Sequence, residues 1–264
     1  GFPTSLVRKG LNVDIAQAVA SQGVDKARIL NTIAERPARE LDRSPFPQHR
    51  KYDEVNGIIS GMFAAAAYRT AVAAGADMAD RGDLPILRAF RKAEGMGCLE
   101  LYLSRLKGFT DFHLQTLAQN FLKRLTSLTL AFSGTSLTSV DELGKVLGRI
   151  QGLTSLSLAL YWTNVACVNE LGRGLGQITG LTSLRLILAA TKIACINELG
   201  KGLGQMKGLT SLILDSSETK VAAVDELGRG LGQMKGLTSL WLDLNSTEVA
   251  CVDELGKGLG QIKG

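Results

Sequence analysis

The chain has 264 residues, of which 45% are hydrophobic and 21% are charged. This composition excludes an intrinsically disordered chain, and the length accommodates one or two domains. The net charge of +5 is carried by residues 1–124, which hold 18 basic and 13 acidic residues, because residues 125–264 hold 12 of each kind.

The chain begins GFPTSLVRKG, without an initiator methionine and without the pattern of a signal peptide. A fragment and a chain from which a targeting segment has been removed both fit this start. The expected location is intracellular, and organellar in the second case. Residues 12–35 then predict two short helices, and Pro37 ends the second of them.

Residues 36–51 form a basic connector with three prolines, which predicts an extended segment. It could be an arm that lies on an acidic partner or a phosphate surface, or a solvated linker. Its basic residues are Arg36, Arg39, Arg43, Arg50 and Lys51.

A longer helix is predicted for residues 52–74 and another for residues 83–94. The uncharged run of the first, from Val55 to Tyr68, is too short to span a bilayer, so no transmembrane span of the chain's own is expected. Residues 1–97 are therefore expected to form an all-α region that caps the first strand of a repeat array in residues 98–264, because the terminal units of such an array need a cover.

From Leu125 to the last residue the sequence repeats every 28 residues without an insertion. The five copies open at Leu125, Leu153, Leu181, Leu209 and Leu237. Positions 1, 4 and 6 of each copy are leucine, and leucines two apart on an extended segment share a face, so each copy is expected to open with a strand. A period of this length is typical of a solenoid, a propeller or an array.

The second half of each copy predicts a helix, because its apolar residues recur at spacings of three and four. In the second copy these are Val168, Leu171, Leu175 and Ile178. Gly172 and Gly176 lie one turn apart on this helix and are expected to let neighbouring helices approach closely. The glycines that close the copies are expected to adopt a left-handed conformation; these are Gly152, Gly180, Gly208 and Gly236.

This order of strand, loop, helix and glycine resembles the leucine-rich repeat family, in particular its longer, helix-bearing units of the ribonuclease-inhibitor type. The resemblance covers residues 98–264, counting a degenerate unit at 98–124 before the five regular ones. It implies an α/β, right-handed solenoid with a curved parallel sheet inside and helices outside.

The family usually places Asn or Cys three residues after the last strand leucine, and here only Asn245 matches. A constant threonine two residues later is expected to take over the hydrogen bonding of the loop; it is Thr135, Thr163, Thr191, Thr219 and Thr247.

The sequence offers no constellation for catalysis, a metal or a cofactor. The two histidines, His49 and His113, have no partner at a meaningful spacing, and the familiar nucleotide and hydrolase motifs do not occur. Three of the four cysteines occupy position 15 of their copies. They are interpreted as small, half-buried core residues, with a disulfide across neighbouring coils as the alternative. We therefore expect a protein that is not an enzyme and needs no cofactor.

Comparison of the copies with one another locates the variable surface. Positions 5 and 7 vary from copy to copy, and positions 8 to 10 vary just as freely. Positions 5 and 7 face away from the buried leucines, on the concave side of the sheet. Apolar and aromatic side chains among them indicate a partner-binding face rather than drift at solvent positions. The residues of this face are Arg185, Ile187, Ile213, Asp215, Trp241 and Asp243, and Phe132, Tyr161 and Trp162 are candidate loop contacts.

Three functions remain open at this level. The first is a non-enzymatic protein-interaction scaffold, an accessory or structural subunit of a larger hetero-complex. The second is a binder of nucleic acid or of an anionic surface through the basic N-terminal region, although no nucleic-acid motif occurs. The third is an accessory subunit of an organellar membrane complex, photosynthetic or respiratory, in peripheral contact with the membrane assembly. We also expect further residues or another subunit to cover the outer flank of the last copy, next to Leu255, Leu259 and Ile262.

Overall fold

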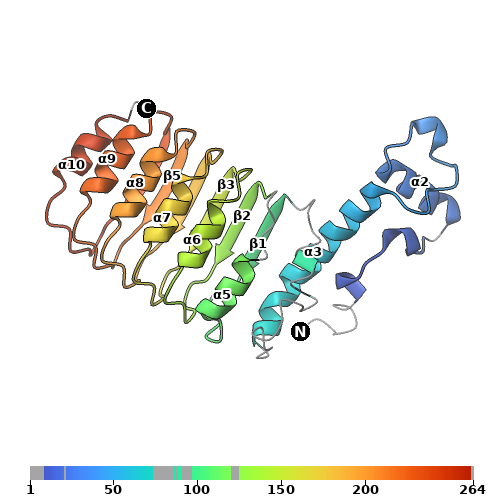
Figure 1. Ribbon diagram of the computed structural model, residues 1–264, viewed down its shortest axis with the longest axis horizontal. Helices are drawn as coiled ribbons and strands as arrows, with labels where there is room; N and C mark the ends of the chain where they lie inside the picture. Colours follow the sequence, from blue (N-terminus) through green and yellow to red (C-terminus); the bar gives the residue numbers. More distant parts are fainter. Residues whose placement is uncertain are drawn as a thin grey trace. The chain divides into compact units, whose positions relative to one another are not determined.

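A computed structural model describes residues 9–20, 22–73, 86, 89–90, 97–119 and 125–262 (Figure 1). The chain divides into two compact units. The first unit contains Gly1–Tyr68 and Asp83–Met96, and the second contains Arg69–Gly82 and Gly97–Gly264. Most of the helix predicted for residues 83–94 lies outside the described residues.

The regular secondary structure described in the first unit is helical. Its elements are η1 (Ile15–Gln17), α2 (Gly23–Ile33), η2 (Ala38–Glu40) and most of α3 (Arg50–Ala73). The second short helix and the long helix are thus confirmed, whereas the first short helix is only a 3-10 turn. Among the described residues, no helix is long and apolar enough to cross a membrane.

The basic connector is folded and not extended, so this part of the prediction was wrong. Asn31 of α2 is completely buried, and its amide nitrogen donates to the carbonyls of Leu41 at 2.8 Å and Arg43 at 2.7 Å. The connector also contains η2. These two hydrogen bonds from the buried Asn31 amide nitrogen hold the connector as a loop against α2.

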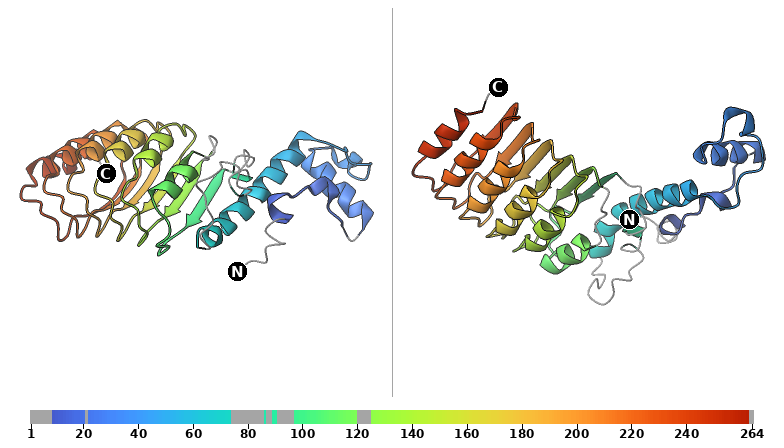
Figure 2. Two further views of the ribbon diagram at one scale, coloured as in Figure 1. Left: turned by 60° about the horizontal axis from the view of Figure 1, so that its bottom comes forward. Right: turned by 45° about the horizontal axis from the view of Figure 1, so that its top comes forward.

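The second unit contains a sheet of six parallel strands in chain order, with helices along one side (Figures 1 and 2). The strands are β1 (Cys98–Tyr102), β2 (Ser127–Ala131), β3 (Ser155–Ala159), β4 (Ser183–Ile187), β5 (Ser211–Asp215) and β6 (Ser239–Asp243). The helices are α5 (Asp111–Ala118), α6 (Asp141–Leu147), α7 (Asn169–Gly176), α8 (Asn197–Gln205), α9 (Asp225–Gln233) and α10 (Asp253–Leu259). The regular strands pair in a 28-residue register, as in Leu156 with Leu184. The predicted strands and the α/β solenoid are therefore confirmed.

The core lies between the sheet and the helices, where the leucines of positions 1, 4 and 6 are buried in the first four regular units. Position 8 also points into this core, which was not recognised from the sequence. Phe132 occupies it in the first regular unit, is fully buried, and stacks on Phe109 with ring centroids 5.1 Å apart. Phe132 is therefore a core residue, and its prediction as a loop contact was wrong.

The loops after the strands are held by backbone hydrogen bonds between coils and by the constant threonine within each coil. Thr163 is one example: its hydroxyl donates to the carbonyl of Leu160 at 2.8 Å. The equivalent bond occurs in all five regular units. The expected role of this threonine in the hydrogen bonding of the loop is thus confirmed, and the Leu160 carbonyl also accepts the N–H of Thr163 at 3.1 Å.

In the regular units the left-handed residues lie in these loops and not at the ends of the helices. Position 10 has positive φ in every regular unit, with Gly134 at 68°, Trp162 at 58° and Ala190 at 52° as examples. None of the four glycines that close the copies has positive φ, so that prediction was wrong. The left-handed conformation lets the N–H of position 10 bond to the next coil, as Gly134 does to the carbonyl of Tyr161 at 2.8 Å.

Glycines bring the helices into backbone contact, as the sequence predicted. A Cβ atom on Gly172 would lie 2.5 Å from the backbone of Glu198 in α8. The equivalent Gly256 of α10 has no neighbour within 4 Å. On the same flank Val252 and Leu259 are 54% and 39% exposed, whereas Val224 and Leu231 of the preceding coil are fully buried.

Candidate interaction surface

The six residues predicted for the concave side lie together on three neighbouring strands. Arg185, Ile213 and Trp241 are paired in register across β4, β5 and β6, and Ile187, Asp215 and Asp243 form a parallel row two residues further along. We call these six residues the open sheet face. Alternation along each strand directs them away from the buried leucines, so the sheet geometry itself assembles the surface.

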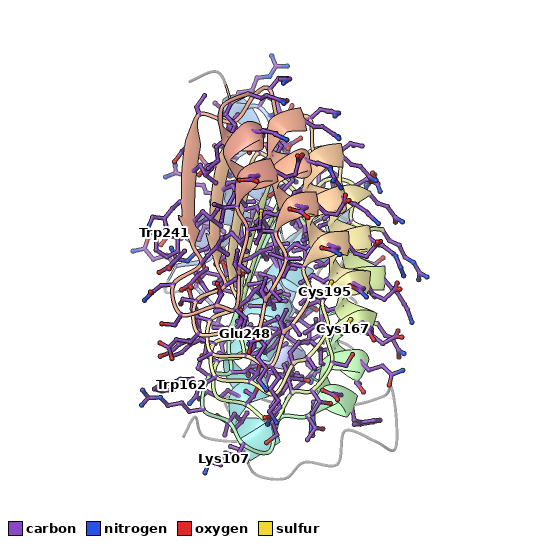
Figure 3. The ribbon with its side chains drawn as sticks, turned by 90° about the vertical axis from the view of Figure 1, so that its left-hand side faces the viewer. Lys107, Trp162, Cys167, Cys195, Trp241 and Glu248 are labelled. Carbon is purple, nitrogen blue, oxygen red and sulfur yellow. The ribbon has the colours of Figure 1, made fainter. Side chains whose placement is uncertain are left out.

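Trp241 is the largest side chain of the open sheet face and is 48% exposed. Arg185 is also exposed, and the other four residues are half-buried. Figure 3 shows Trp241 projecting from the side of the second unit that faces away from the helices. Ile213 lies directly beside it, so an aromatic and an aliphatic side chain together present an apolar strip to solvent.

The charged residues of the open sheet face form no ion pairs among the described residues. Asp215 accepts hydrogen bonds from the N–H and the hydroxyl of Ser217 at 3.0 and 2.7 Å, and Asp243 accepts one from the N–H of Asn245 at 2.8 Å. Within the described part of the chain, no ion pair involves Asp215, Asp243 or Arg185. Both carboxylates are thus oriented by hydrogen bonds from their own loops.

The helices carry the opposite arrangement, in which charged residues neutralise one another. Lys201 pairs with Glu198 at 2.8 Å, and Lys257 pairs with Glu254 at 2.6 Å. Arg173 bridges two helices, because its guanidinium contacts Glu170 of its own helix and Glu198 of α8. The hydrogen bonds from Lys201 and Arg173 hold the pKa of the Glu198 carboxyl below its usual range.

The two remaining loop candidates lie at the exposed edge that follows β3. Tyr161 and Trp162 stack with ring centroids 4.4 Å apart, and Trp162 is 60% exposed. Trp162 projects on the same side of the unit as Trp241 in Figure 3. Tyr161 and Trp162 are thus accessible to a partner, whereas Phe132 is buried.

Two exposed residues of the same sheet surface were missed from the sequence. Register places Glu100 and Tyr102 of β1 at positions 5 and 7, and Tyr102 is 57% exposed. The Tyr102 hydroxyl donates to the Glu100 carboxylate at 3.0 Å, and this bond raises the pKa of Tyr102. The degenerate unit was counted from Cys98 as its first residue, whereas Cys98 pairs with Ser127 at position 3. Alignment on Leu99 and Leu101 would have found both residues.

Most cations of the basic connector are engaged within the first unit. Arg43 pairs with Glu40 at 3.6 Å and Arg50 with Glu54 at 3.2 Å. Lys51 lies 3.2 Å from Glu35 and 3.5 Å from Glu54, and the guanidinium of Arg36 lies 3.9 Å from the ring centroid of Phe46. Arg39 has no ion pair among the described residues. The connector therefore presents less positive charge than its composition indicates.

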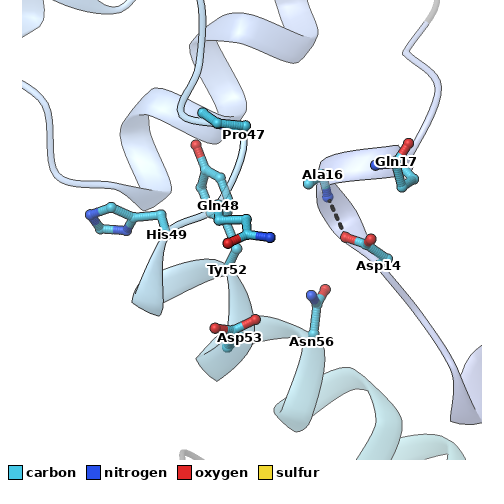
Figure 4. Close-up of a pocket in the computed structure, with 9 residues that line it drawn as sticks. All are labelled: Asp14, Ala16, Gln17, Pro47, Gln48, His49, Tyr52, Asp53 and Asn56. Carbon is cyan, nitrogen blue, oxygen red and sulfur yellow. Dashed lines mark hydrogen bonds between the residues drawn. The ribbon is translucent and has the colours of Figure 1, made fainter.

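A cavity of about 370 Å³ opens in the first unit at the start of α3 (Figure 4). Its lining is mostly polar and comprises Asp14, Ala16, Gln17, Pro47, Gln48, His49, Tyr52, Asp53 and Asn56. Asp14 accepts from the N–H of Ala16 at 3.0 Å, and Asn56 accepts from the N–H of Ile15 at 2.8 Å. These two side chains are thus used to hold η1. No sequence signal marks this cavity, because its residues come from segments about thirty positions apart.

The four cysteines are free and exposed, so their interpretation as half-buried core residues was wrong. In the first four regular units positions 13 and 16 turn inward, as Val165 and Val168 do, and the residues between them face outward. Among the described residues, no group of three or more His, Cys, Asp or Glu side chains could hold a metal ion.

No family model and no curated protein matches the chain. Solved structures that resemble it include the leucine-rich repeat-containing protein LegL7 from Legionella pneumophila, at 18% identity and a TM-score of 0.37 over 67% of this chain and 58% of that one. Another is TLR13 in its complex with ssRNA13, at 17% identity and a TM-score of 0.33 over 67% of this chain and 29% of that one. The chain thus spans less than two thirds of each protein. Its own architecture, six parallel strands alternating with helices in a leucine-patterned repeat, is that of an α/β leucine-rich-repeat solenoid.

Proposed function

We propose that the chain is a protein-interaction scaffold that holds a protein partner on the open sheet face. The observation that carries this proposal is the exposed Trp241, which lies beside Ile213 on a face whose charged residues have no ion pair in the described part of the chain. Tryptophan and arginine are the residues that most often dominate the energy of protein interfaces.

The unequal distribution of charge between the two sides supports this assignment. Each basic residue of α6 to α10 pairs with a glutamate of its own helix. The charged residues of the open sheet face form no ion pair among the described residues, and Asp215 lies next to Asp243 in register. Like charges directly opposite one another on neighbouring strands are destabilising. A partner with a basic group over the two carboxylates would relieve this repulsion.

The chemistry of the face therefore defines the partner that fits it. Such a partner presents an apolar side chain that covers Trp241 and Ile213, a basic group towards Asp215 and Asp243, and an acidic group towards Arg185.

In our proposal the chain serves as an accessory subunit of a hetero-complex. Its 28-residue, helix-bearing units support an assignment to the ribonuclease-inhibitor-like subclass of repeats.

The test is affinity purification of the tagged full chain from cells that express it, with two matched variants. Trp241→Ala removes the anchor of the open sheet face, and Lys201→Ala removes an exposed charge of the helix side. We expect a specific partner to be retained by the wild type and by Lys201→Ala, and lost with Trp241→Ala. Equal retention by all three proteins would refute the proposed surface.

A further inference from the structure

Two cysteines occupy equivalent places on neighbouring coils of the second unit. Cys167 and Cys195 are both at repeat position 15, two residues before α7 and α8, and both thiols are free and exposed. Figure 3 labels the two side chains on the loops that lead into these helices. Neither residue belongs to the open sheet face.

The backbone holds these two coils together on both sides of the cysteines. Before them, the N–H of Lys192 donates to the carbonyl of Val165 at 3.0 Å. After them, a Cβ atom on Gly172 would lie 2.5 Å from the backbone of Glu198. These contacts hold the two coils together before and after the cysteines, and the paired strands of the same coils are about 4.8 Å apart. Disulfide-linked residues have Cα separations of about 4.4–6.8 Å.

The other two cysteines have no such neighbour. Cys251 is also at position 15, but Ala223 occupies that position in the preceding coil. Cys98 lies in β1, which is at the opposite end of the sheet from β6. The chain thus contains one pair of adjacent thiols and two isolated thiols of similar exposure, which serve as internal controls.

We propose that Cys167 and Cys195 form a dithiol modification site that low-molecular-weight disulfides oxidise to a cystine between the two coils. One cysteine thiolate attacks a sulfur atom of the small disulfide, forms a mixed disulfide and releases one small thiolate. The second cysteine thiolate then attacks the protein sulfur of the mixed disulfide and releases the second small thiolate. The protein loses two protons and two electrons, and the small disulfide is reduced to two thiols.

The test is incubation of the reduced full chain with oxidised glutathione, followed by alkylation of the remaining thiols and peptide mass spectrometry without reduction. We expect a cystine that joins the peptides of Cys167 and Cys195, while Cys98 and Cys251 end as free thiols or as mixed disulfides with glutathione. The linked protein should melt at a higher temperature than the reduced protein, because the cross-link constrains the unfolded chain.

Two variants separate a specific pair from general thiol reactivity. With Cys195→Ser, Cys167 should accumulate as a stable mixed disulfide, because its resolving thiol is gone. With Cys251→Ser, the cystine should form at the wild-type rate. Separate glutathione adducts on Cys167 and Cys195 in the wild type, or a cystine that includes Cys98 or Cys251, would overturn the proposal.

Discussion

Gly202 of α8 lies against Gly172 of α7 so closely that a Cβ atom on Gly202 would be 2.0 Å from the Gly172 carbonyl oxygen. The same relationship joins Gly174 to Gly144 and Gly230 to Gly200. Each regular helix after the first thus presents one glycine to the helix before it. The cost of glycine in a helix, about 1 kcal/mol relative to alanine, is offset by the backbone contact that it allows.

Alanine substitutions at two glycines should therefore have opposite effects. Gly202→Ala forces α7 and α8 apart, and we expect the free energy of unfolding to fall by about 1–3 kcal/mol. Gly256→Ala has open space around its new methyl group and should raise the free energy of unfolding by about 0.5–1 kcal/mol. Chemical denaturation of the full chain measures both, and a similar loss in the two variants would contradict the glycine contact.

The buried leucines should contribute far more stability than the threonines beside them. Leu184 is 1% exposed, and we expect Leu184→Ala to cost about 2–5 kcal/mol. The exposed Thr154 donates its hydroxyl to the carbonyl of Thr126 at 2.9 Å, and Thr154→Ala should cost about 0.5–1.5 kcal/mol, the net value of one hydrogen bond. Denaturation midpoints of the two variants decide between these values. Equal losses in the two variants would contradict the assignment of Leu184 to the buried face of the sheet.

Trp241 should matter little for folding, because about half of its surface is already exposed. We expect Trp241→Ala to change the free energy of unfolding by less than half as much as Leu184→Ala does. Thermal melting of the two variants under identical conditions provides the comparison. A loss with Trp241→Ala as large as that with Leu184→Ala would make Trp241 a core residue.

The free energy of unfolding should depend on pH through His113, at the start of α5. His113 is the third residue of α5, and its Nδ1 accepts a hydrogen bond from the N–H of Thr110 at 3.3 Å, which requires a neutral ring. Burial lowers the pKa of His113. The unfolded chain, with a pKa of about 6.5 at this residue, therefore binds more protons than the folded chain just below that pH. Stability should be complete above about pH 6.5 and should fall as the pH drops through that value towards the lower pKa of the folded state.

The matched control for this effect is His113→Gln, because glutamine can accept the same hydrogen bond and does not titrate. Denaturation of both proteins between about pH 7.5 and pH 5 should show an additional loss in the wild type. All other titrating groups are common to the two proteins, so their effects cancel in the difference. Parallel pH profiles would refute a role for His113 in this dependence.

The repeat period and the leucine spacing were sufficient to predict the strands, their parallel order and the helices, because each unit obeys the same local pattern. They were not sufficient for position 8, where Phe132 and Ser216 are both buried although they differ in size and polarity. The residue type at position 8 does not reveal which way its side chain points, because the geometry of the turn sets that direction. The exposure of Cys167 was missed for the same reason, since the inward turn of Val165 and Val168 is a property of the coil.

The six residues of the open sheet face could be selected from the sequence because the copies can be compared with one another. What the sequence could not supply was the pairing of charges. Glu198 and Arg173 are 25 residues apart and lie on different helices, yet they form an ion pair at 3.1 Å. Only the stacking of the coils distinguishes the matched charges of the helices from the unmatched charges of Asp215 and Asp243.

The proposal that a protein partner is held on the open sheet face is tested most directly by site-specific photo-crosslinking in cells that express the chain. A photoreactive residue replaces Ile213 in one version and Lys201 of α8 in the other, which places the probe on the sheet side or on the helix side. The account predicts a covalent protein adduct from position 213, and none from position 201. Adducts from position 201 alone, or equal adducts from both positions, would contradict it.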